Sequence, residues 1–258
     1  MKTITQLALA FACLLSVHNV SFAQADAGAA LAQAQQAGQF TFLVFYKDNS
    51  PQTQKMLQVV QQGVAGHAQQ ATLATVSMAT PAGQALAEKF QVSRAPMPMT
   101  VAVAPNGAVT GLFSRQVAKA NIDAAIVPPV MMDCMKQLQD QKLVFVCLTT
   151  SEQAAVPAGV RALQLDPTFK DRMALIGLNV LDTSEARLMQ QLKVDVAQVQ
   201  GPYAALIAPP GVLVGHFTAT STAQQIGAAI HKAGKCCDDP NCKHAQNAQA
   251  SQSNATRR

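Results

Sequence analysis

The sequence PMTVAVAPNG at residues 98–107 has a proline, a short apolar strand and a turn that reverses the chain. A related sequence, PYAALIAPPG, occupies residues 202–211, which is 104 positions later. Upstream the spacing is 102, as between Leu86 and Leu188. A repeat of this length is a whole domain, because solenoid repeats run at roughly 20 to 50 residues. The chain therefore contains two related domains in tandem.

Both halves alternate strands and helices and then end in a hairpin and a helix, which predicts an α/β sandwich. In the first half we expect helices over 29–37, 54–64, 82–90 and 121–127, and strands over 40–45, 73–78, 100–104 and 108–113. In the second half we expect helices over 130–141, 184–192 and 222–233, and strands over 143–148, 174–180, 204–207 and 212–217. The predicted domains are residues 24–128 and 129–233.

The two ends of the chain differ from these domains. Lys2, the apolar run Ile4–Val17 and the small residues before Gln24 predict a secretory signal peptide over residues 1–23, cleaved after Ala23. A membrane anchor is the alternative, but the run is shorter than the roughly 20 residues that span a bilayer. Lipidation at Cys13 is the other alternative, and it fits poorly. We therefore expect a periplasmic or secreted protein without a membrane segment after cleavage.

Residues 234–258 are rich in Gln, Asn, Ala, Ser and Lys and have almost no aliphatic side chains, which predicts a disordered tail. Without Lys2 the chain has 18 basic and 14 acidic residues, and it has two tyrosines and no tryptophan. No dense basic run and no set of aromatic stacking platforms is present. We therefore expect no nucleic-acid partner.

Each half resembles the thioredoxin fold, over Ala29–Val127 and again over Val130–Ala233. The resemblance is carried by a helix, a Val six residues before a proline, a strand, a Pro-Asn-Gly-type turn and a hairpin strand. It implies two tandem thioredoxin-like α/β sandwich domains. It also implies a cis-proline before the strand of each hairpin, facing the active site. Pro98 and Pro202 match that position, and Pro96 is the rival in the first half.

Both active-site slots that the resemblance implies lack cysteine. A redox-active thioredoxin has Cys-x-x-Cys where the central strand turns into the next helix, because a helix N-terminus favours the thiolate. The aligned residues here are Ser50, Pro51, Gln52 and Thr53 in the first half, and Glu152, Gln153, Ala154 and Ala155 in the second. A hydroxyl does not exchange disulfides, so the sequence predicts no dithiol activity at either slot. Ser50 is predicted to cap the helix that follows.

Two cysteines lie inside the second half. Cys147 falls on the central strand, where Phe45 is its predicted counterpart, and we interpret it as a small buried hydrophobe. Cys134 lies in a helix among methionines, namely Met131, Met132 and Met135. Thiolate and thioether ligands select Cu(I). Methionines at helical spacing are more often part of a core.

The tail contains Cys236, Cys237, Cys242 and His244. These ligand types suit Zn²⁺ or Cu(I), although the spacing matches no established zinc module. The alternatives are a disulfide from Cys236 or Cys237 to Cys242, and an accessible thiol pair active in redox exchange. Removal of the signal leaves five of the six cysteines, an odd number that implies a free thiol, a ligand or an intermolecular bond.

The sequence therefore favours an exported, redox-inactive protein with two thioredoxin-like domains that binds a protein or an extended peptide, or acts as a scaffold. No catalytic residue is assigned, and we lean against an enzyme. The first alternative is a soft-metal protein that binds Cu(I) or Zn²⁺ through its tail. The second is thiol-disulfide exchange by the tail cysteines.

Overall fold

The computed structural model describes residues 26–150 and 155–234. The first sheet is built around β1 (Phe40–Tyr46), whose run FTFLVFY is buried at every position except Tyr46. A strand that is apolar on both faces belongs at the centre of a sheet covered by helices on both sides. It pairs in parallel with β2 (Ala71–Ser77) and antiparallel with β3 (Met99–Val103), and β4 (Val109–Ser114) pairs with β3. The strand order is β2-β1-β3-β4.

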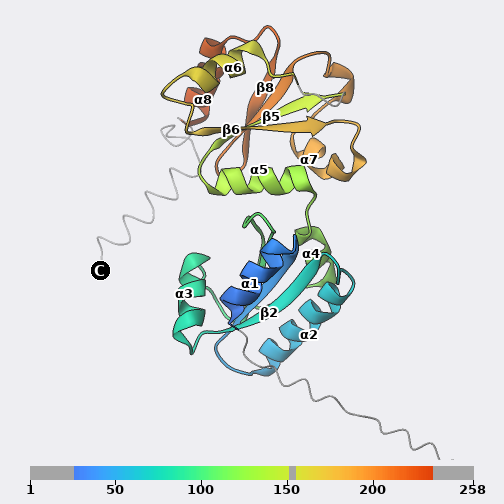
Figure 1. Ribbon diagram of the computed structural model, residues 1–258, viewed down its shortest axis with the longest axis vertical. Helices are drawn as coiled ribbons and strands as arrows, with labels where there is room; N and C mark the ends of the chain where they lie inside the picture. Colours follow the sequence, from blue (N-terminus) through green and yellow to red (C-terminus); the bar gives the residue numbers. More distant parts are fainter. Residues whose placement is uncertain (1–25, 151–154, 235–258) are drawn as a thin grey trace, which may run out of the picture.

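Four helices cover the two faces of this sheet (Figure 1). They are α1 (Ala27–Gln36), α2 (Pro51–Ala65), α3 (Pro81–Lys89) and α4 (Lys119–Ala125). The side chains of Leu43 and Phe45 pack with α1 and α3, and those of Phe42 and Val44 pack with α2 and α4. The sheet is thus the middle layer of a three-layer sandwich.

The second half repeats this arrangement, with strand order β6-β5-β7-β8. Its strands are β5 (Leu143–Thr149), β6 (Met173–Asn179), β7 (Tyr203–Ala208) and β8 (Val212–Thr218). Its helices are α5 (Pro129–Gln139), α6 (Ala158–Leu165), α7 (Ala186–Gln191) and α8 (Ala223–Gly234), with short 3₁₀ turns η1 (Thr183–Glu185) and η2 (Val196–Gln198). The prediction of two tandem thioredoxin-like α/β domains is confirmed. The predicted signal peptide and all of the predicted tail except Gly234 lie outside the described residues.

The central strands correct one detail of the repeat. Cys147 pairs with Ala204, and Val44 pairs with Thr100, so Cys147 and Val44 occupy the same place in the two sheets. Their spacing is 103, so the prediction that Phe45 is the counterpart of Cys147 is wrong by one residue. A shift of one residue moves a strand side chain to the other face of the sheet. Cys147 accordingly packs on the α6 and α8 side.

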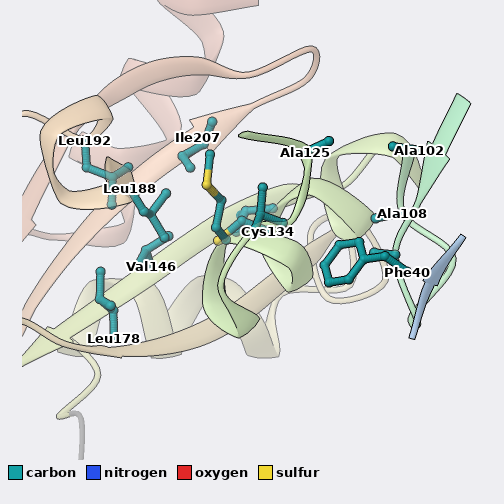
Figure 2. Packing of buried hydrophobic residues seen from close by; sticks show 14 of the residues in the cluster. Phe40, Ala102, Ala108, Ala125, Cys134, Val146, Leu178, Leu188, Leu192 and Ile207 are labelled. Carbon is teal, nitrogen blue, oxygen red and sulfur yellow. The ribbon is translucent and has the colours of Figure 1, made fainter. Parts of the chain in front are cut away.

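The two domains share a hydrophobic core at α5, which Figure 1 shows between the two sheets. Cys134 on α5 lies between Phe40 and Ala108 of the first domain and Leu188 and Ile207 of the second (Figure 2). All of these side chains belong to one continuous cluster of buried residues. Helix α5 therefore packs on both domains.

Hydrogen bonds surround this shared core. The Asn106 amide nitrogen in the β3–β4 turn donates to the Met132 carbonyl at 3.1 Å and to Asp133 Oδ1 at 3.0 Å. The Gln139 amide pairs with the backbone of Val109, accepting from its N–H at 2.9 Å and donating to its carbonyl at 2.7 Å. These bonds fix the hairpin of the first domain against α5.

Candidate functional site

The first slot lies at the N-terminus of α2, directly after β1. Ser50 is the N-cap in extended conformation, with Pro51 at the first helical position. Its Oγ accepts from the Thr53 N–H at 3.4 Å and lies 3.2 Å from Thr53 Oγ1, and its own N–H donates to Asp48 Oδ1 at 3.1 Å. Ser50 thus acts as a helix cap, as the sequence predicts. Gln52 is exposed, and its amide donates to the Arg115 carbonyl at 3.1 Å.

Pro98 lies at the same edge of the sheet as this slot. The pairing of Phe45 with Met99, continued by one step, brings Tyr46 beside Pro98. The Met97–Pro98 peptide bond is cis, and the Pro98 carbonyl accepts from the Arg115 N–H at 2.8 Å. Pro98 is buried, whereas Met97 is only partly buried. Within the described part of the chain, the Met97 backbone N–H and carbonyl make no hydrogen bond.

A pocket of about 450 Å³ adjoins the slot and the residues that follow β4. Its lining residues are Pro51, Gln52, Lys55, Met56, Val59, Arg115, Gln116 and Val117. Arg115 has a φ of +63°, in the left-handed region that is uncommon for a residue with a side chain. Its backbone is held from both sides, since its N–H donates to Pro98 and its carbonyl accepts from Gln52.

The sequence predicts the slot residues and Pro98 as parts of the site. It does not predict Lys55, Arg115 or the open backbone of Met97, meaning the N–H and carbonyl that make no hydrogen bond within the described residues. The spacing of Lys55 from Pro51 places both on one face of a helix and could have been noticed. Arg115 had no such signal, because its place depends on where β4 ends and on a backbone conformation unusual for arginine.

The second domain lacks the corresponding arrangement at Pro202. Its cis peptide bond is Pro209–Pro210, in the turn between β7 and β8, and the bond before Pro202 is trans. The prediction that Pro202 is a cis-proline is therefore wrong. The chain enters β7 through Gly201, whose φ of +75° is one that glycine adopts without strain. Beside Pro202, the rings of Tyr203 and His216 lie 5.7 Å apart.

Of the second predicted slot, Glu152, Gln153 and Ala154 lie outside the described residues, and Ala155 is exposed. Helix α6 begins at Ala158, after Pro157 as the N-cap. The interval from the end of the central strand to the next helix is thus longer here than in the first domain. The spacing of the repeat therefore does not carry the first slot over to the second domain residue by residue.

The two described cysteines are core residues. Cys134 is 2% exposed and Cys147 is 2% exposed, and both are free thiols. Burial raises the pKa of the Cys134 thiol to about 12, with Glu185 and Asp133 adding to the effect, and burial raises the pKa of the Cys147 thiol to about 11. Neither thiol is therefore activated for nucleophilic or redox chemistry, since reactive cysteines have a lowered pKa.

Within residues 26–150 and 155–234, no group of three or more His, Cys, Asp or Glu side chains is placed to hold a metal ion. Met131 is buried in the same core as Cys134, with Met132 and Met135 packed against it. The predicted tail ligands Cys236, Cys237, Cys242 and His244 lie outside the described residues. No helix in the described part has the length and apolar character needed to cross a membrane.

Solved structures similar to this chain are thioredoxin-fold proteins. A thioredoxin from Thermus thermophilus is 26% identical over 42% of this chain and 84% of that chain, with a TM-score of 0.31. The N-terminal NTD_N/C domain of the alkylhydroperoxide reductase AhpF from Enterococcus faecalis is 14% identical over 78% of this chain and 98% of that chain, with a TM-score of 0.30. The zinc-bound form of human ERp44 is 10% identical over 82% of this chain and 59% of that chain, with a TM-score of 0.34.

No protein-family model matches the chain, and no curated protein matches it. The thioredoxin-like fold assigned above follows from the strand order and connections of the two sheets.

Proposed function

We propose that the protein is an exported, redox-inactive binding module that docks an extended segment of a partner protein on its first domain. The docking surface is the end of the sheet where Met97 and Pro98 lie next to the slot at Ser50, and it is called the Pro98 edge below. The observation that carries the proposal is the open backbone of Met97. Its N–H and carbonyl have no partner in the described part of the chain. Met97 directly precedes Pro98, whose carbonyl accepts from Arg115, a lining residue of the pocket of about 450 Å³. An extended peptide satisfies such a donor and acceptor through its own backbone.

The absence of thiol chemistry at the slot supports binding over exchange. Ser50 stands where the resemblance puts a reactive cysteine, and its hydroxyl is engaged by Thr53. The described thiols of Cys134 and Cys147 are buried, with a strongly raised pKa. Binding of a segment at this slot therefore requires no covalent bond to a described thiol.

The docking test uses a library of random seven-residue peptides displayed on phage and selected on the purified full chain. Selected peptides are synthesised and their site is mapped by amide chemical shifts. We expect peptide enrichment and shifts at Met97, Gln52 and Arg115. Absence of enrichment, or shifts confined to the second domain, would contradict the proposal. An insulin-reduction assay coupled to dithiothreitol tests redox inactivity, and turnover by the purified protein would overturn that part.

A second candidate function is soft-metal binding by the tail, favoured by three thiols and an imidazole within residues 236–244. Native mass spectrometry of the reduced protein with Cu(I) or Zn²⁺ tests it. A stoichiometric adduct that disappears when residues 235–258 are deleted supports this function. A thiol count on the same sample separates metal ligands from a disulfide or from free thiols active in exchange.

A further inference from the structure

The lining of the pocket next to the Pro98 edge has positively charged side chains and no negatively charged one. Lys55 and Arg115 line it, and its lining contains no aspartate or glutamate. The other charged hollows of the first domain contain at least one carboxylate. Lys47 lines a hollow together with Glu88, and the hollow next to α5 is lined by Lys89, Lys136 and Asp140, of which Lys136 and Asp140 form an ion pair.

This pocket combines apolar and charged lining residues. Met56, Val59 and Val117 provide apolar surface, with Met56 buried and the two valines partly buried. Lys55 and Arg115 are exposed and come from two different elements, helix α2 and the segment after β4. The hydrogen bond from Gln52 to the Arg115 carbonyl ties these two elements together.

Arg115 adopts its left-handed conformation at an energetic cost, because its Cβ crowds the backbone there. Unusual conformations of this kind persist where surrounding contacts hold them, and they cluster at binding sites. Two backbone hydrogen bonds hold Arg115, to Pro98 and to Gln52. Its guanidinium thus starts from a fixed backbone position, which lowers the entropic cost of pairing with a ligand.

We propose that the segment docked at the Pro98 edge is acidic: an aspartate or glutamate side chain of the partner lies between Lys55 and Arg115, next to an aliphatic side chain that contacts Met56, Val59 and Val117. This inference rests on the proposed function and specifies the partner's chemistry. Arginine pairs with a carboxylate through two parallel hydrogen bonds, and lysine adds a point charge.

The peptide selection described above tests this composition directly. We expect the selected peptides to share an aspartate or glutamate adjacent to Val, Ile or Leu. Selected peptides that map to Met97 but lack an acidic residue would overturn the acidic inference and leave the docking function intact. If no peptide is selected, both fall together.

Charge-reversal variants of the full chain give a second test, with one selected peptide and its twin in which Glu is replaced by Gln. Lys55→Glu and Arg115→Glu are each expected to weaken binding of the acidic peptide about tenfold, because attraction becomes repulsion. Binding of the neutral twin is expected to change much less. An equal loss for both peptides would contradict the inference, since it indicates a structural effect.

Lys170→Glu is the matched control, because it makes the same change of charge at an exposed position of the second domain. It is expected to leave the affinity of both peptides unchanged. Circular dichroism confirms folding, and Lys55→Gln replaces Lys55→Glu if the reversal unfolds the chain. A loss of binding with Lys170→Glu equal to that with Lys55→Glu would show that net charge alone acts, and would overturn the site.

Discussion

At the scale of single residues, Glu185 is a carboxylate in an apolar core. Its side chain is 1% exposed and accepts from the backbone N–H groups of Val130 at 2.7 Å and Met131 at 3.2 Å. These are donors of the first turn of α5, which a helix leaves unpaired unless a side chain supplies an acceptor. Glu185 thus caps the helix that joins the domains, from a position 54 residues further along the chain than Met131.

The protonation of Glu185 predicts a dependence of stability on pH. Burial raises its pKa above the ordinary value of 4.5, more than the two backbone hydrogen bonds lower it, and Asp182 and Asp133 raise it further. The folded chain therefore binds this proton more tightly than the unfolded chain. Its contribution to the free energy of unfolding is fully present below pH 4.5 and is lost as the pH rises through the raised pKa.

The Glu185→Gln variant isolates this contribution, because glutamine does not titrate. Urea unfolding of both proteins is measured from about pH 4 to pH 8. The free energy of unfolding of the natural protein minus that of Glu185→Gln is expected to fall as the pH rises and then to level off. A difference that instead grows with pH would mean that the hydrogen bonds outweigh burial and that the pKa is lowered.

The raised thiol pKa values predict resistance to alkylation. Iodoacetamide reacts with the thiolate, so Cys134 and Cys147 are expected to remain unmodified in the native protein at about pH 8. Peptide mass spectrometry measures the labelling of each cysteine. In concentrated guanidinium chloride both are expected to react fully, which serves as the control. Labelling of Cys134 faster than global unfolding would reveal local opening of α5.

At the scale of elements, the end of β4 nearest the hairpin turn is covered by a side chain instead of another strand. The Gln139 amide offers Val109 one acceptor and one donor, as a neighbouring strand would. An edge strand with free backbone groups invites pairing with other chains, and native proteins cover such edges. Gln139 therefore both protects the edge and joins α5 to the first domain.

Substitution of Gln139 is expected to open this edge. Gln139→Ala removes both hydrogen bonds, and Gln139→Glu places a carboxylate oxygen against the Val109 carbonyl, so each is expected to lower the free energy of unfolding by about 1–2 kcal/mol. Hydrogen exchange of the Val109 amide is expected to accelerate in the alanine variant. Gln190→Ala, at an exposed position of α7, is the control. Unchanged Val109 exchange in Gln139→Ala would refute the role of the amide.

The sequence predicts elements better than it predicts their exact alignment. The apolar run of β1 and the turn at Asn106 and Gly107 each encode a local structure, so most strands and helices could be predicted. Helix α6 could not be predicted, because Pro157 and Gly159 weaken the helical signal of its sequence. Its apolar residues Val160 and Leu163 indicate a helix only when their packing on the sheet is known. The counterpart of Cys147 is wrong by one residue because the spacing of the repeat changes along the chain: it is 103 between the central strands and 102 between the strands that follow them.

Some residues of the candidate site can likewise be predicted from local sequence, and others depend on tertiary structure. Ser50 and Pro51 form a local capping signal, and the cis-proline at Pro98 follows from the resemblance to thioredoxins. Pro202 was misplaced because Gly201 offers the chain a different path into β7. Arg115 and Lys55 meet only through tertiary structure, since 60 positions separate them in sequence.

At the scale of the whole molecule, the duplicated domains are joined through a shared core instead of a flexible linker. The buried cluster that includes Phe42 and Ile122 continues through Met131 and Cys134 to Leu188. Separation of the domains would expose this apolar surface to water, at a cost of roughly 25 cal/mol for each Å². The interface therefore couples the stability of one domain to that of the other.

This coupling predicts that the two domains unfold in one transition. The chain has two tyrosines and no tryptophan, and Tyr46 lies in the first domain and Tyr203 in the second. Tyrosine fluorescence of Tyr203→Phe therefore reports on the first domain, and that of Tyr46→Phe reports on the second. Circular dichroism of each variant provides a control, because it reports on both domains and corrects for any change in stability caused by the substitution.

In urea, the fluorescence and circular dichroism transitions of each variant are expected to coincide, since coincidence of different probes is the test of two-state unfolding. Cys134→Asp, which buries a charge in the shared core, is expected to lower the midpoint reported by both tyrosines, because the cluster around Cys134 draws side chains from both domains. If only the Tyr203 midpoint falls, α5 belongs energetically to the second domain alone. The Pro98 edge would then be carried by a domain whose stability is independent of its repeat.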